Sequence, residues 1–104
     1  MIQTIEEDGY TFRSLDMGGL IRICRFEASD GFEPLPDSDD PTALTKWLAH
    51  PIMQDYMVAV IQTVCQKAPH DLTATAIMAL EPSACLDLYR KCLLHRFPSG
   101  EPKN

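Results

Sequence analysis

The chain has 104 residues, of which 45% are hydrophobic, and it carries a net charge of −6 at pH 7. This length suits one domain with a modest core, which we expect over residues 1–97, followed by a polar tail over residues 98–104. No basic stretch leads into an apolar run at the start, and no apolar run reaches the ~18 residues of a membrane span. We therefore expect neither a secretion signal nor membrane insertion, and the excess of acidic groups disfavours direct nucleic-acid binding.

The first predicted elements are two strands joined by a tight turn. Residues 2–7 and residues 10–15 are rich in strand-forming side chains and flank Asp8 and Gly9. Asp and Gly both tolerate positive φ, which the central positions of a short hairpin turn require. The sequence therefore predicts a β-hairpin over residues 2–15.

A third strand is predicted over residues 20–27, which follow Gly18 and Gly19 and are rich in β-branched and aromatic side chains. Together with the hairpin it would make an N-terminal three-stranded antiparallel meander. Its apolar side chains do not alternate cleanly, so a bulge or burial on both faces remains open.

Three arginines, Arg13, Arg22 and Arg25, are the only basic residues of this predicted sheet. If Leu15 pairs with Leu20, Arg13 would face Arg22, and like charges opposed on one face are destabilising unless something neutralises them. The neutralising group is either the acidic part of this chain or an external anionic partner. The arginine-bearing sheet face is therefore a candidate contact surface.

An acidic segment follows. Six carboxylates and no Lys or Arg lie between residues 27 and 40, so this segment carries the whole net charge. Its prolines and turn formers predict a long loop over residues 28–40, in which we expect two apolar side chains to be exposed between the acids. The sequence favours a docking segment or a solvated linker over a calcium site, because the Gly and Glu of an EF-hand loop are missing. The candidate contact residues are Asp30, Phe32, Glu33, Leu35, Asp37 and Asp39.

Helices are predicted after this loop. Asp40 and Asp71 are candidate N-caps, and Pro41 and Pro82 suit first helical positions. The longest predicted helix has apolar residues three and four positions apart over a broad arc, so we expect the other elements to pack around it. The predicted helices cover residues 42–49, 52–68, 72–80 and 82–97.

The cysteines and histidines allow two kinds of reactive site. Cys85, Cys92 and His95 have spacings that bring them to one side of a helix, as in a metal site, but both cysteines fall on the stripe that the helix must bury. Cys65 could act as a nucleophile with His70 or His50 as base, but its predicted place at a helix C-terminus among apolar residues raises a thiol pKa. We therefore expect free structural thiols and no metal or other cofactor.

The sequence thus predicts an α+β protein, a three-stranded meander followed by three to four helices around the helix at residues 52–68. We expect a small cytoplasmic protein-binding module or regulator, without enzymatic activity, that uses the acidic segment or the arginines. Two alternatives stay open: a small metal-binding or thiol-dependent enzyme, and an acidic mimic that occupies the basic groove of a nucleic-acid-binding protein. The sequence leaves the partner and the oligomeric state open.

Overall fold

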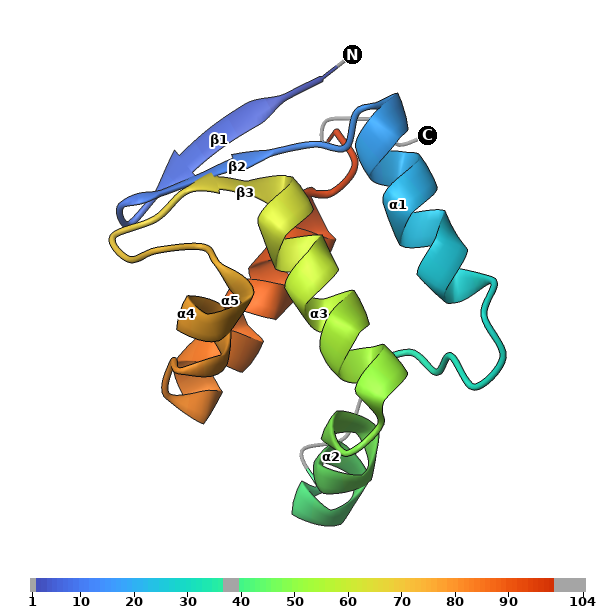
Figure 1. Cartoon of the computed structure of the whole chain (residues 1–104). Helices are drawn as coiled ribbons and strands as arrows, with labels where there is room; N and C mark the ends of the chain where they lie inside the picture. Colours follow the sequence, from blue (N-terminus) through green and yellow to red (C-terminus); the bar gives the residue numbers. More distant parts are fainter. Residues whose placement is uncertain (1, 37–39, 99–104) are drawn as a thin grey trace.

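The computed structural model describes residues 2–36 and 40–98. It has the predicted α+β architecture, with one three-stranded antiparallel sheet beside the helices (Figure 1). In chain order, the elements in these residues are β1 (Thr4–Glu7), β2 (Tyr10–Arg13), α1 (Met17–Glu27), α2 (Pro41–Leu48), α3 (Pro51–Val64), β3 (Cys65–Lys67), α4 (Ala74–Met78) and α5 (Pro82–His95).

The predicted hairpin is confirmed as β1 and β2, which pair antiparallel. Asp8 and Gly9 at its turn have φ of 53° and 86°, the positive values that a two-residue hairpin turn requires. The third strand, however, is β3, which pairs with β2 with a shift in register between Thr11 and Phe12. The sheet order is therefore β1-β2-β3, and its third strand comes from the chain directly after α3.

The strand predicted over residues 20–27 is wrong, because these residues belong to helix α1. Asp16 caps this helix by accepting a hydrogen bond from the backbone N–H of Gly19 at 2.8 Å. Gly19 and Ile23 are its buried residues. A Cβ at Gly19 would approach Thr63 Cγ2 to 2.6 Å, so the missing side chain is what lets α1 lie close against α3.

The predicted central helix is confirmed as α3, although it ends at Val64 because Cys65 turns to an extended conformation and begins β3. Figure 1 shows α3 running through the middle of the molecule, and α1, α2, α4, α5 and β3 all pack against it. Its buried residues form much of the core: Met53, Tyr56, Met57, Ala59, Val60, Ile61 and Val64.

The remaining helices follow the prediction with one change of cap. α2 begins as expected, with the Asp40 carboxylate accepting from the N–H of Thr42 at 3.0 Å. α4 is shorter than predicted and is capped by Thr73 rather than by Asp71, since Thr73 Oγ1 accepts from the N–H of Ala76 at 3.1 Å. No helix in the described ranges is both long and apolar enough to span a membrane.

Candidate functional site

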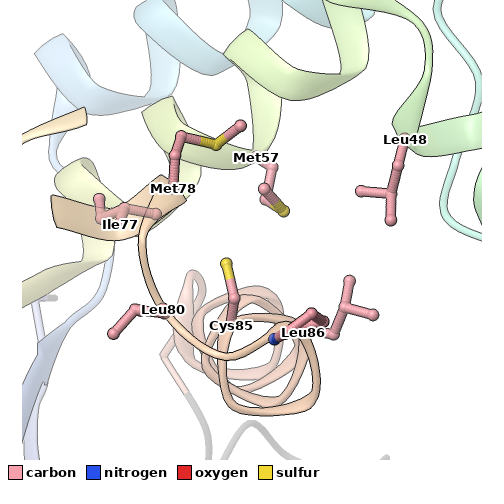
Figure 2. Close-up of a pocket in the computed structure, with 8 residues that line it drawn as sticks. Leu48, Met57, Ile77, Met78, Leu80, Cys85 and Leu86 are labelled. Carbon is pink, nitrogen blue, oxygen red and sulfur yellow. The ribbon is translucent and has the colours of Figure 1, made fainter. Parts of the chain in front are cut away.

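An apolar pocket lies between α3, α4 and α5 and also touches the end of α2. Its volume is about 130 Å³. Figure 2 shows Met57 and Cys85 approaching it from α3 and α5, with Met78 on one side and Leu48 on the other. The lining residues are Leu48, Met57, Ile77, Met78, Leu80, Pro82, Cys85 and Leu86.

The corner between α4 and α5 forms one wall of this pocket for a local reason. Pro82 disfavours the α conformation in the residue before it, and Glu81 is accordingly extended, with ψ of 138°. α4 ends at Met78 with Ala79 as its C-cap, and α5 begins at Pro82 with Glu81 as its N-cap. This sharp restart sets Leu80 and Pro82 at the pocket instead of continuing one helix past it.

A second hollow adjoins the pocket at Met78 and has a volume of about 470 Å³. Hydrogen bonds from the Arg22 guanidinium to Gln62 Oε1 at 3.0 Å and to Thr63 Oγ1 at 3.4 Å hold that side chain at the hollow. Its lining residues are Arg22, Phe26, Gln54, Asp55, Val58, Gln62, Ala74 and Met78. We call the two hollows together the Met78 groove, because Met78, which is 52% exposed, lines both.

The acidic segment is attached to the core. The ring of Phe32 meets Tyr56 edge-on, with their centroids 4.9 Å apart. The Trp47 indole N–H donates to the backbone carbonyl of Glu33 at 2.8 Å, and the Glu33 N–H donates to Met53 Sδ at 3.4 Å. These contacts fix the path of the segment across α2 and α3.

This attachment corrects part of the prediction. Phe32 and Leu35 are half-buried and pack against the core, so the expectation that both are exposed is wrong. Asp30 and Glu33 are exposed, as expected for side chains that meet a partner. Asp37 and Asp39 lie outside the described residues.

The three arginines do not share a surface. Arg13 makes an ion pair with Asp16 at 2.7 Å, Arg22 lies at the Met78 groove, and Arg25 is exposed on α1. The predicted opposition of Arg13 and Arg22 across a sheet is therefore wrong, because residues 17–27 are helical. The neutralising group beside Arg13 is Asp16, which precedes the acidic segment.

The three residues of the candidate metal site have different surroundings. Cys85 faces the pocket, Cys92 is fully buried, and the His95 ring packs on Phe12 with centroids 5.1 Å apart. His95 Nε2 lies 3.7 Å from a carboxylate oxygen of Glu7. Within residues 2–36 and 40–98, no group of three or more His, Cys, Asp or Glu side chains could hold a metal ion.

The thiols are free, and burial raises the pKa of Cys65, Cys85 and Cys92. A raised thiol pKa keeps the nucleophilic thiolate scarce at neutral pH. His70, the base considered for Cys65, instead lies 3.2 Å from the hydroxyl of Tyr10. The structure thus gives no support to a Cys65–His70 nucleophile pair.

Sequence reasoning identified Arg22 and missed the rest of the Met78 groove. The apolar periodicity of each helix indicates which residues are buried, but it does not indicate where several helices leave a gap between them. The break at Pro82 was the one local signal of this corner. Comparison with protein-family models, curated proteins and solved structures finds no match.

Proposed function

We propose that this protein is a small, non-enzymatic protein-binding module of the cytoplasm that holds one apolar side chain of a partner in the pocket between α3, α4 and α5. The observation that carries the proposal is the apolar lining of a pocket of about 130 Å³. A cavity of about 150 Å³ accepts a benzene molecule, whereas sites for drug-sized ligands measure about 300–1,000 Å³. The pocket therefore suits a single leucine- or phenylalanine-sized group.

The chemistry of the pocket supports binding rather than catalysis. An active site brings titratable or polar groups together around the reacting atoms. The pocket has one reactive side chain, Cys85, and burial raises its pKa, which favours the inert thiol. Met57 and Met78 give the walls flexible, polarizable side chains, which are common at surfaces that adapt to a partner.

The hollow beside the pocket would take the polar part of the partner segment. Asp55 is exposed there, and Arg22 is held in place through Gln62 and Thr63. A side chain that is already ordered loses less entropy when a partner binds. An apolar anchor beside fixed polar contacts is the usual layout of a groove that binds a peptide or helix.

The acidic segment is a second proposed contact of the same partner. Trp47 and Met53 hold its backbone, so that Asp30 and Glu33 are presented from an ordered chain. Such carboxylates would attract a basic stretch and mainly raise the rate of association. The buried free thiols suit a reducing compartment, which supports the cytoplasmic assignment.

Selection from a random peptide library displayed on phage, with the purified protein as the target, tests this function. We expect the enriched peptides to share one large apolar residue. Met78→Lys should lower their affinity by about tenfold or more, because a lysine would bring charge to both hollows. Leu94→Lys is the matched control, because Leu94 is 72% exposed and lines neither hollow.

The outcome that refutes the pocket is enriched peptides that bind wild type and Met78→Lys equally. Asp30→Asn with Glu33→Gln should weaken only peptides with Lys or Arg, and raising the salt concentration should remove the difference. Stoichiometric zinc or iron in protein purified without a chelator would favour the metal-binding enzyme instead.

A further inference from the structure

Three sulfur-bearing side chains line the apolar pocket, and each comes from a different helix. Met57 lies on α3, Met78 on α4 and Cys85 on α5. Figure 2 shows the sulfur atoms of Met57 and Cys85 pointing into the space between their helices, with the Met78 side chain at its edge. Among the described residues that line the pocket, sulfur atoms are the only side-chain groups able to bind a metal, because the others are hydrocarbon: Leu48, Ile77, Leu80, Pro82 and Leu86.

The three sulfur-bearing side chains combine buried and accessible positions. Met57 is 3% exposed and Cys85 is 7% exposed, whereas Met78 is 52% exposed. Methionine has three rotatable bonds, so the two thioethers can adjust their positions around the thiol of Cys85. An ion from solvent could therefore meet Met78 first and then reach the two buried sulfur atoms.

The chemistry of these ligands selects a soft ion of single charge. Thiolate and thioether ligands favour Cu(I), whereas Ca²⁺ and Mg²⁺ require oxygen ligands. Zn²⁺ also binds thiolates, but one thiolate would neutralise only one of its two charges, and a remaining charge is costly to bury in an apolar pocket. Cu(I) with one thiolate and two neutral thioethers has no net charge, so it suits this environment.

Cys85 must lose its proton when such an ion binds. Burial raises the pKa of this thiol, so the neutral form predominates without the ion. Cu(I) would displace the proton: a Cu–S bond forms at Cys85, one H⁺ passes to solvent, and copper keeps its oxidation state. The free thiols of this chain suit a reducing compartment, in which copper is held as Cu(I).

We propose that Met57, Met78 and Cys85 form a binding site for one Cu(I) ion in the pocket between α3, α4 and α5. Sequence spacing grouped Cys85 with Cys92 and His95, whereas the fold places it beside methionines of two other helices. The site goes beyond the peptide-binding function and does not depend on it. Bound copper links three helices and occupies the space proposed for a partner's side chain, so the two ligands compete.

Anaerobic titration with Cu(I), in competition with the chromogenic chelator bicinchoninate, tests the site. Cys24→Ser removes the exposed thiol and serves as the reference protein, which we expect to bind one Cu(I) per chain. Adding Cys85→Ala should abolish this binding. Met57→Leu and Met78→Leu should each weaken it by about tenfold or more, because leucine keeps the apolar volume without the thioether. Met17→Leu is the matched control and should keep the affinity, because Met17 is exposed and lies outside the pocket.

Ag(I), a soft ion of the same charge without redox chemistry, identifies the ligands directly. In protein with ¹³C-labelled methionine methyl groups, Ag(I) should shift the resonances of Met57 and Met78 and leave those of Met17 and Met53 in place. It should also raise the midpoint of thermal unfolding, because an ion that binds only the folded state stabilises it.

X-ray absorption at the copper edge should show sulfur neighbours without nitrogen. Far-UV circular dichroism confirms that each variant is folded, and the resonance shifts test the site without any substitution at the pocket. Cu(I) binding that survives Cys85→Ala and both leucine variants, or nitrogen neighbours at the bound copper, overturns the proposal. Resonances of Met57 and Met78 that Ag(I) leaves unmoved overturn it equally.

Discussion

Helices α3 and α1 both have apolar residues on more than one side, but the chain covers them to different extents. α3 has seven buried residues and packs against α1, α2, α4, α5 and β3, whereas α1 has two buried residues and packs mainly on α3. Met17 and Ile21 of α1 remain exposed. The comparison teaches that the apolar content of a helix does not by itself fix its burial, because the tertiary structure decides which of its sides are covered.

Truncation of isoleucines gives the largest expected difference between the two helices. Ile61→Ala in α3 should lower the free energy of unfolding by ~2–5 kcal/mol, because it leaves a cavity at a side chain that is 0% exposed. Ile23→Ala, on the buried side of α1, should fall in the same range. Ile21→Ala should change it by ~0.5 kcal/mol or less, because Ile21 is 47% exposed. Urea denaturation of the three variants measures these values.

Asp55→Ala is the matched control on α3, because Asp55 is exposed on the helix that buries Ile61. Equal small losses for Ile61→Ala and Asp55→Ala would contradict the central place of α3.

The elements that the sequence predicted correctly are those with strong local signals. The Asp8-Gly9 pair favours a hairpin turn independently of tertiary contacts, and both residues have the positive φ that this turn requires. Asp40 with Pro41 starts α2 as expected. The long apolar periodicity of α3 also identified the centre of the core, because a broad apolar arc can be satisfied only by several neighbours.

The errors arose where contacts distant in sequence override local preference. Gly18 and Gly19 indicate a turn, and two glycines cost a helix roughly 1 kcal/mol each, yet Gly19 is helical because α3 packs directly against it. β3 continues the apolar pattern of α3 and becomes a strand because β2 offers it a pairing edge. The attachment of Phe32 and the walls of the Met78 groove likewise depend on distant partners.

The two glycines of α1 compare the side of this helix that packs against α3 with a side that does not, and we expect smaller effects on stability there. Gly19→Ala should destabilise the protein by ~1–3 kcal/mol, because the new Cβ would lie 2.6 Å from Thr63 Cγ2 and 3.1 Å from Leu15 Cδ2. Gly18→Ala should stabilise it by ~0.5 kcal/mol, because the nearest atom is Asp16 Oδ1 at 3.7 Å and alanine favours a helix. Thermal unfolding of the pair measures both, and equal effects would mean that α1 does not approach α3 closely.

The smallest expected effect is on the pH dependence of stability, and it compares Cys92, which is buried in the core, with Cys24, which is exposed on α1. Burial raises the pKa of Cys92 well above its ordinary range, so the folded state keeps this thiol protonated while the unfolded state releases the proton above a pKa of ~8.5. The stabilising contribution is therefore complete below that pH and declines as the pH rises, because the unfolded state then binds fewer protons.

Between pH 8 and pH 9, Cys92 should account for a loss of about 0.7 kcal/mol in the free energy of unfolding. Cys92→Val should remove this part of the pH dependence even if it lowers the stability itself. Cys24→Ser, at an exposed position of α1, is the matched control for replacing a cysteine. Urea denaturation at the two pH values gives the slopes. If Cys92→Val retains the wild-type slope, the titrating group lies elsewhere and Cys92 is more accessible to water than the structure indicates.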